Sequence, residues 1–239
     1  MQVVLLRVGV DTGSGGIHGP LFKDGSFEFV PIWDKSNRFG VNTQTYANTK
    51  GRCRPFIEYF PLQLRQKRQN TFIHRDPEFE TFTYGDPTRP KASLRELKKG
   101  DLLVFYAGLE GWNFRCDPAL YIIGYFEVVK AGLATNFTRS EIKTEFGNNF
   151  HVRHRAIFKD QRKRLVLVKG GPKSRLLNKA VLISSMGNDS SGRCLKILSS
   201  DMQRVFGDFD GHVSIQRSPP RWVHNDFVDK AASFVRSLE

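Results

Sequence analysis

Two apolar stretches in the middle of the chain constrain its fold most strongly. "DLLVFYAGL", residues 101–109, and "ALYIIGYFEVVK", residues 119–130, are rich in the β-branched and aromatic residues that favour strands. A short loop, "EGWNFRCDP", separates them. The two stretches therefore predict two long strands, and with them a fold built on a sheet.

Shorter segments on either side add strands and loops. "QVVLLRVGV" near the N-terminus predicts a buried first strand, and "GSFEFVPI", residues 25–32, alternates as a second strand would. "RLVLV", "AVLIS" and "LKILS" predict further strands. Residues 36–54 predict a long surface loop, and residues 72–90, with aromatic residues and Asp-Pro turns, predict irregular structure packed by rings.

Capping patterns mark the helices. The predicted starts are Ser93–Glu96 and Thr138–Glu141, which both match the capping box, then Ser200 and about Asp226. The first three helices end at Gly100, Gly147 and Gly207. Because no repeat and no low-complexity linker interrupts the chain, we predict one α+β domain over residues 1–239. It combines a mixed, mostly antiparallel sheet or partial β-barrel with short helices and a C-terminal helix.

Charge points to an anionic partner. The net charge is +13 and the isoelectric point is about 9.9. Such an excess favours polyanions through counterion release, and nucleic acid is the commonest polyanion inside cells. The charge gathers in "RQKRQ", "HVRHRAIFKDQRKR" and "KGGPKSR". A basic surface that only maintains solubility is the alternative, but we expect a nucleic acid or a nucleotide as partner.

The cysteines and the hydropathy of the sequence indicate where in the cell the protein is located. Cys53, Cys116 and Cys194 are odd in number, widely separated and without a C-x-x-C pair, which favours free thiols in a reducing environment. "MQVVLLRVGV" is too short, and too interrupted by Arg7, for a signal peptide or a membrane span. We expect a cytoplasmic protein without a membrane role.

The glycine-rich stretch "VGVDTGSGGIHGPLF", residues 8–22, predicts a shaped loop with three possible uses. Asp11 opens an Asp-Thr-Gly-Ser match to the aspartic-protease motif, which would require a dimer because two carboxylates must share a proton. Alternatively, backbone N–H groups around Ser14, Gly15 and Gly16 form a phosphate cradle. In the third interpretation the loop is a tight crossing in which Asp11 caps a backbone amide.

Each histidine taken singly favours a structural role, and His18 and His224 are the better candidates for function because polar, glycine-rich or Asn/Asp-rich residues surround them. No histidine pair has metal-ligand spacing, although separated residues can still assemble a site in three dimensions. No motif for a nicotinamide, a flavin, a methyl donor or a metal ion stands out, so the sequence indicates no cofactor.

An aromatic and basic group follows the first long strand. Tyr106, Trp112, Phe114 and Arg115 lie at or just beyond its end, an arrangement on which a base can stack while cations hold its phosphates. The alternative is that the rings belong to the core. Trp112, in a polar loop, is the least core-like of them.

Residues 95–135 resemble a known strand pair. "LKKGDLLVFYAGL" followed by "ALYIIGYFEVVK" is similar to the paired strands of PUA-like and EVE domains, which are small β-barrels that bind RNA or modified DNA bases. This resemblance implies an aromatic base pocket near Tyr106, Trp112 and Tyr125.

Across its whole length the chain resembles the nucleotide modification associated domain family, third type. The resemblance rests on "RVGVDTGSGGIHGPLFKDGSFEFVPI", "DPEFETFTYGD", "GDLLVFYAGL", "GGPKSRLLNKAVLIS" and "SIQRSPPRWV". It implies an α+β domain associated with systems that modify nucleobases. It also implies functional roles for Arg7, Asp11, Gly15, Gly16, Asp24, Ser174, Arg175, Arg217 and Arg221. We expect the residues of 106–115 and 173–175, Lys173 among them, to close over the nucleotide.

Three functions follow as hypotheses. The first is an enzyme that modifies a nucleotide or a nucleobase, with Asp11, Asp24 and His18 as candidate catalytic residues and Asp11 as general base or orienting group. The second is a module that reads modified bases without changing them, and the third is a dimeric aspartic-protease-like enzyme. The oligomeric state stays open.

Overall fold

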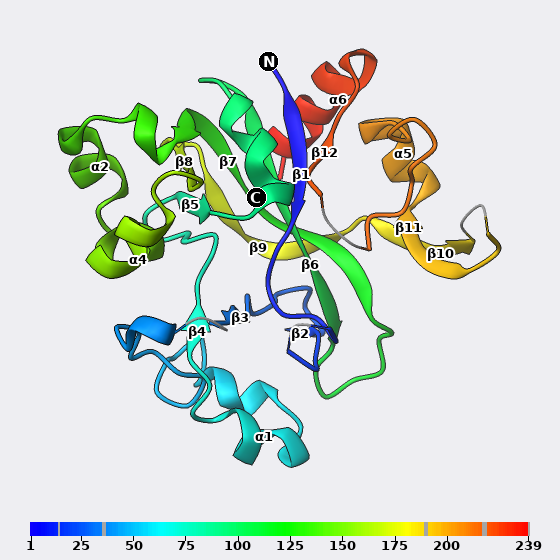
Figure 1. Ribbon diagram of the computed structural model, residues 1–239. Helices are drawn as coiled ribbons and strands as arrows, with labels where there is room; N and C mark the ends of the chain where they lie inside the picture. The colour runs from blue at the N-terminus through cyan, green and yellow to red at the C-terminus, as the bar shows by residue number, and fades with distance from the viewer. Residues whose placement is uncertain (14, 35–36, 189–190, 217–218, 239) are drawn as a thin grey trace.

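The computed structural model describes residues 1–13, 15–34, 37–188, 191–216 and 219–238, and within them eight strands form one sheet (Figure 1). At its centre, β6 (Leu102–Gly111) and β7 (Ala119–Leu133) run antiparallel, so the two predicted long strands are confirmed. The strand order is β12-β1-β6-β7-β8-β5, with β2 added to β6 and β9 added to β7. The sheet is mixed, mostly antiparallel and not closed into a barrel, and the α+β class is confirmed.

The first strand runs parallel to the central strand β6. β1 (Val3–Arg7) pairs with β6 so that Arg7 lies opposite Tyr106, and it therefore delivers the following residues to the end of the sheet. β2 is also parallel to β6, whereas the other strand pairs of this sheet, among the described residues, are antiparallel. The other strands of the sheet are β2 (Gly19–Leu21), β5 (Thr83–Asp86), β8 (Val166–Gly170), β9 (Arg175–Leu182) and β12 (Arg221–Trp222).

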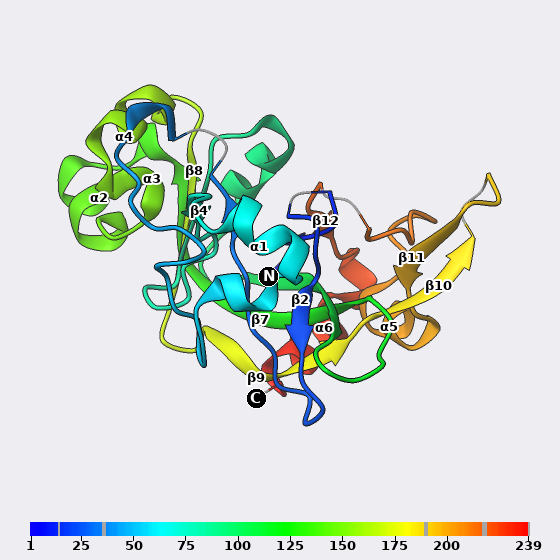
Figure 2. The same ribbon diagram turned by 90° about the horizontal axis from the view of Figure 1, so that it is seen from below.

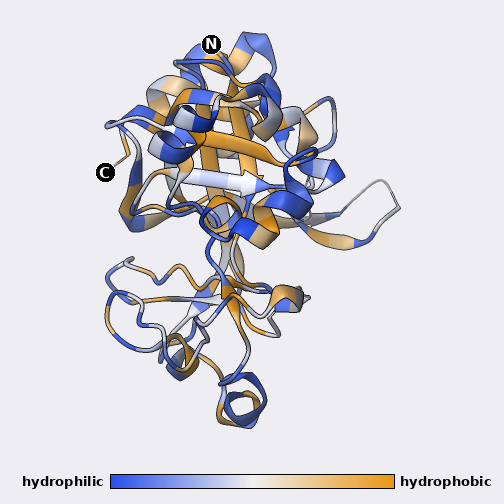
Figure 3. Cartoon of the chain, turned by 60° about the vertical axis from the view of Figure 1, so that its left-hand side comes forward, coloured by the Kyte–Doolittle hydropathy of each residue, from blue (hydrophilic) through white to orange (hydrophobic). Residues whose placement is uncertain are grey.

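Aromatic rings fill the core against this sheet. Phe105 on β6 and Phe126 on β7 have ring centroids 4.7 Å apart, and Phe79 lies 5.5 and 5.6 Å from them in edge-to-face geometry. Several strands at the centre of the sheet are coloured hydrophobic, while the helices around them carry both hydrophilic and hydrophobic residues (Figure 3). Residues 72–90 thus supply packed rings, as the sequence predicted.

Helices cover the two ends of the sheet (Figures 1 and 2). Near β8 lie η4 (Ala134–Asn136), α2 (Arg139–Phe146), α3 (Phe150–Arg153) and α4 (Arg155–Gln161). At the other end, α5 (Ser200–Phe206) and α6 (Asn225–Arg236) pack together, and the hairpin of β10 (Ser184–Asn188) and β11 (Cys194–Leu198) projects beside them. The predicted capping box at Thr138 is confirmed, and so are the later helices.

A smaller body lies below the sheet (Figure 3). It holds η1 (Asn37–Phe39), η2 (Phe56–Tyr59), α1 (Leu62–Arg68) and the strand pair β3 (Ile32–Trp33) and β4 (Ile73–His74). Its own apolar cluster includes Tyr46 and Phe60. The predicted loop over residues 36–54 is therefore packed rather than a free surface loop, because the buried Tyr46 hydroxyl donates to the Pro31 carbonyl (2.8 Å).

Two local predictions are wrong. Residues 25–32 do not form the predicted strand: Phe27 makes only an isolated bridge with Leu21, and the expected alternation is absent because the neighbouring Glu28 is buried too, where its carboxylate accepts from the Arg52 N–H (2.7 Å). Ser93 does not start a helix, because the 3-10 helix η3 (Arg89–Glu96) begins earlier, with Pro90 in its first turn. The three cysteines are free, as predicted. Within the described ranges no helix is long and apolar enough to cross a membrane.

Candidate functional site

A cavity of about 700 Å³ lies where strand ends of the sheet meet the smaller body. Its volume suits a small ligand, since such sites usually measure about 300–1,000 Å³. The residues that line it come from well-separated segments: Arg7, Val8, Gly9, Asp11, Gly13, Ile32, Trp33, Asp34, His74, Asp76, Tyr84, Asp86, Pro87, Thr88, Lys91, His151, Gln161 and Gln216. Charged and titratable groups are frequent in this wall, which is typical of functional sites.

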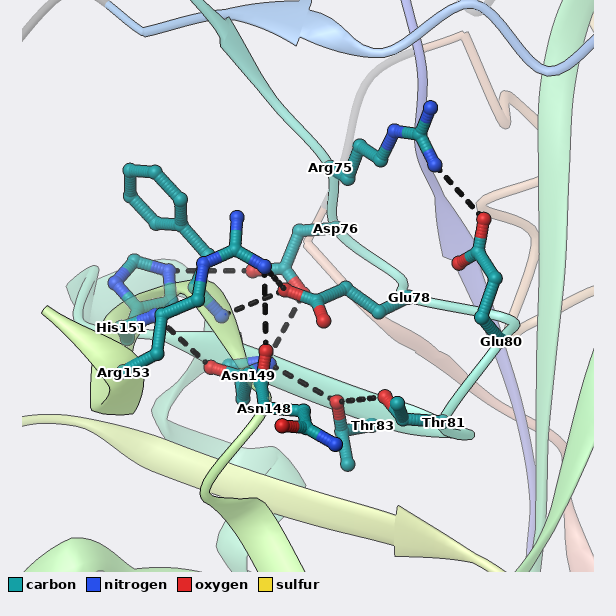
Figure 4. A network of polar contacts seen from close by, with 12 residues as sticks. Arg75, Asp76, Glu78, Glu80, Thr81, Thr83, Asn148, Asn149, His151 and Arg153 are labelled. Carbon is teal, nitrogen blue, oxygen red and sulfur yellow. Dashed lines mark hydrogen bonds and ion pairs between the residues drawn. The ribbon is translucent and has the colours of Figure 1, made fainter. Parts of the chain in front are cut away.

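Asp76 stands at the centre of a buried polar cluster in this wall (Figure 4). Its Oδ2 lies 3.2 Å from His151 Nε2 and 3.4 Å from His74 Nε2, while its Oδ1 accepts from the Gly85 N–H (3.0 Å). Burial alone would raise the pKa of Asp76, but the two imidazoles hold it below its ordinary value. The Asp76 carboxylate is therefore fixed in place and ionised at neutral pH.

His151 is held from both sides. The short helix α3 begins at Asn149, whose Oδ1 accepts from the His151 N–H (3.1 Å), and His151 Nδ1 lies 2.6 Å from the Gln161 Oε1. An amide oxygen only accepts, so Nδ1 carries the hydrogen of this contact. Burial lowers the pKa of His151, but hydrogen bonding with Asp76 and the charge of that carboxylate outweigh burial and leave the pKa above its ordinary value.

Close packing fixes this geometry. The His74 ring stacks on the Phe150 ring with centroids 4.2 Å apart. Gly85 lets β5 pass against the cluster, because a Cβ there would lie 2.8 Å from Asn149 Oδ1 and 2.9 Å from His151 Cδ2. The His74 Nε2 atom is buried and has no hydrogen-bond partner among the described residues. The ring is thus oriented toward Asp76 without a completed hydrogen bond.

Lys91 adds a buried cation to the wall. The side chain is only 8% exposed, and its Nζ makes no hydrogen bond within the described ranges. Burial lowers the pKa of Lys91 to about 8, and the charge of Asp86 opposes this only in part. Both Asp86 oxygens are already engaged, with the Tyr84 hydroxyl (3.1 Å) and the Thr88 N–H (2.6 Å).

Glu78 forms a second layer behind the cluster (Figure 4). Its Oε1 accepts from the Phe150 N–H (2.6 Å) and lies 3.8 Å from Arg153. Burial raises its pKa to about 7. This carboxyl group anchors the start of α3, and through it the position of His151.

Two of the residues singled out in the sequence line the cavity. Arg7 ends β1 and pairs with Asp11 (3.2 Å), and both side chains face the same space. The Gly15 and Gly16 N–H groups donate to the Asp11 carbonyl (2.8 and 3.0 Å), so they close the loop and do not line the cavity. Ser14 and Arg217 lie outside the described residues.

The aromatic group does not reach the cavity. Tyr106 is fully buried in the core and donates to the Ile215 carbonyl (2.9 Å), because the β6 pairing turns it inward. Trp112 packs edge-on against Tyr59 at 5.3 Å in the smaller apolar cluster. Arg115 is exposed on the β6–β7 loop. The base pocket expected near Tyr106, Trp112 and Tyr125 is therefore not assembled by these rings.

The remaining predicted residues also lie away from the lining. Asp24 is exposed and accepts from Ser26 in a turn (3.0 and 2.6 Å), and His18 Nδ1 faces Glu110 (3.3 Å). Three residues lie at or just before the start of β9: Lys173 is exposed, the buried Ser174 Oγ accepts from the Glu127 N–H (3.1 Å), and Arg175 is exposed beside Tyr125. Arg221 lies apart from them on β12 and donates to the Ser214 carbonyl (3.0 Å).

Four residues of this wall are not predicted as site residues from the sequence: His74, Asp76, Lys91 and His151. Asp76 and His151 are 75 positions apart, so no local spacing connects them. The usable signal was "FIHRDP", in which a histidine and an aspartate follow a short apolar stretch with one residue between them. Lys91 gave no signal, because a lysine after a proline predicts an exposed side chain.

The sequence of the chain matches one known protein family. Residues 2–237 match the family described as nucleotide modification associated domain 3, which confirms the resemblance seen in the sequence. No curated protein and no solved structure matches the chain.

Proposed function

The chain belongs to the nucleotide modification associated domain 3 family, and on that premise we propose that it is an enzyme that modifies a nucleotide or a nucleobase inside the cavity. The observation that carries this proposal is the buried ammonium of Lys91 in the cavity wall, which has no hydrogen-bond partner in the part of the chain that the structure describes. A buried charge without a hydrogen-bond acceptor is unfavourable, and an anionic ligand that accepts from it offsets that penalty. The phosphate of a nucleotide is such an anion.

Other groups of the wall suit the remaining parts of a nucleotide. Trp33 lines the cavity, and the Arg68 guanidinium lies 4.1 Å from its ring centroid. A base stacks well on such a ring, with about 1–3 kcal/mol for each stacked base. Asp11 can accept hydrogen bonds from an exocyclic amine of that base. The Asp76 carboxylate and the imidazoles of His74 and His151 are groups that can accept or donate a proton during the reaction.

The cavity is compatible with a reader of modified bases but argues against an acid protease. A reader of modified bases would use Lys91 and Trp33 in the same way but would not change the base. An acid protease would need two carboxylates sharing a proton, and the pairing of Asp11 with Arg7 argues against that role.

Nucleotide binding tests the role of Lys91. Isothermal titration calorimetry with nucleosides, nucleoside 5′-monophosphates and short oligonucleotides compares the wild-type chain with Lys91→Met. We expect tighter binding of at least one phosphate-bearing compound than of its nucleoside. Lys91→Met should lower the affinity for that compound roughly 10- to 100-fold, which is the range for a lost charge-assisted hydrogen bond.

The matched control is Lys230→Met, which removes an exposed lysine on α6. Its affinities should equal those of the wild type. Equal affinities for Lys91→Met, or no preference for phosphate in the wild type, would contradict the assignment of Lys91.

A further inference from the structure

We propose that His74, Asp76 and His151 bind one divalent first-row transition metal ion at the cavity wall. This site is defined by its three donor atoms and does not depend on which ligand the cavity takes. Its test therefore has a readout separate from nucleotide binding.

The distances between donor atoms fit a shared ion. Ligand atoms about 2.1 Å from an ion and about 90–110° apart lie about 3.0–3.4 Å from each other. The Asp76 Oδ2 is 3.2 Å from His151 Nε2 and 3.4 Å from His74 Nε2, and the three donor atoms all lie within 4.8 Å of one another. One ion can thus contact all three after small side-chain shifts.

The hydrogen-bonding pattern favours a cation between these atoms. His151 Nδ1 donates to Gln161, so Nε2 is the nitrogen that faces Asp76, and a metal ion bound there takes the place of the proton that Nε2 otherwise shares with that carboxylate. His74 Nε2 also faces the same carboxylate oxygen and has no hydrogen-bond partner in the described ranges. A metal ion supplies the positive charge that this oxygen and the two nitrogens can share.

The surroundings orient the donors as metal sites require. The Gly85 N–H occupies Asp76 Oδ1 and leaves Oδ2 for the ion, while Gln161 fixes the tautomer of His151. Such outer contacts set ligand orientation in metal sites. Phe150 stacks on His74 and holds the plane of its ring.

The donor set indicates the class of ion. Two imidazoles and one carboxylate suit Zn²⁺, Fe²⁺ and Mn²⁺, whereas Mg²⁺ and Ca²⁺ prefer oxygen ligands alone. Three protein ligands leave at least one position for water or a substrate atom. The cavity on which these residues open supplies the space for it.

Direct metal binding tests the proposal. The untagged chain is freed of metal with a chelator, titrated with Co²⁺ or Zn²⁺, and followed by visible absorption and by elemental analysis after dialysis. We expect one ion for each chain. His74→Gln should bind at least about 100-fold more weakly, because a direct ligand contributes more than the outer contacts whose loss weakens metal sites about 10- to 100-fold.

His212→Gln is the control, because His212 is exposed and away from the cavity wall. It should bind the ion as the wild type does. A second measurement needs no variant: in the histidine-labelled wild type, Zn²⁺ should shift the NMR signals of two imidazoles in slow or intermediate exchange and leave those of His212 unchanged. A wild-type chain that retains no ion, or unchanged binding in folded His74→Gln, would overturn the proposal and leave an Asp76–His151 ion pair.

Discussion

Replacing Lys91 by methionine should stabilise the ligand-free protein, and the gain should depend on pH. The side chain is 8% exposed, and burial lowers the pKa of Lys91 from 10.5 to about 8. A pKa change of one corresponds to about 1.4 kcal/mol, so keeping this ammonium buried at neutral pH costs about 3 kcal/mol of folding free energy. Methionine keeps most of the apolar stem and removes the charge.

The sign of the pH effect follows from proton binding. Between about pH 8 and 10.5 the unfolded chain still holds the proton of Lys91, whereas the folded chain has released it. The wild type therefore gains stability relative to Lys91→Met as pH rises through this window. The advantage of the variant should be about 3 kcal/mol at pH 7 and close to zero near pH 10.5.

Urea unfolding of the wild type and Lys91→Met at both pH values measures this difference. The buffer must lack phosphate and sulfate, because an anion bound at Lys91 would offset the penalty. Lys230→Met, which changes an exposed lysine, should unfold as the wild type does at both pH values. A variant that is less stable than the wild type at pH 7, or an advantage that does not change with pH, would refute the reasoning.

Three further predictions follow from the same structure. The affinity for a nucleoside monophosphate should fall as pH rises from 7 to 9.5, because Lys91 loses its proton near pH 8; calorimetry at both pH values checks this, and a constant affinity would contradict it. Phe105→Ala should lower the free energy of unfolding by about 3–5 kcal/mol in denaturant titrations, since its ring is fully buried among others; a loss below about 1 kcal/mol would count against this packing. Thr138→Ala should remove about 1 kcal/mol of stability, and it should raise the pKa of Glu141 only in part from its present value of about 2, because the Thr138 N–H and Lys130 still hold the carboxylate and only the hydroxyl donor (2.9 Å) is lost; side-chain NMR checks this, and an unchanged Glu141 titration would speak against the capping box.

The sequence was sufficient where local signals decide the structure. The long apolar runs of β6 and β7 and the capping box at Thr138 depend on neighbouring residues, and these predictions are confirmed. The alternation around Glu28 failed because Arg52 and Tyr59, which are distant in sequence, supply partners that let this carboxylate lie inside. A local pattern carries no information about such partners.

The site could be predicted only in part for the same reason. Arg7 and Asp11 follow a recognisable strand, so their place at its end was within reach of sequence reasoning. His74, Lys91 and His151 meet through the packing of β4, η3 and α3 around one cavity. The spacing of these residues along the chain gives no indication that they lie close together in the folded protein.

The most direct test of the central claim is a mass-spectrometric inventory of nucleosides from the DNA, the tRNA and the free nucleotide pool of cells. Cells expressing the wild type are compared with cells expressing Asp76→Asn, which replaces the central carboxylate of the cavity, and with cells expressing the control Asp229→Asn on α6, each at equal amounts of folded protein. We predict a nucleoside or nucleotide that appears or disappears with the wild type and with Asp229→Asn but not with Asp76→Asn. Identical inventories in all three would contradict base modification in this cavity and favour a reader of modified bases.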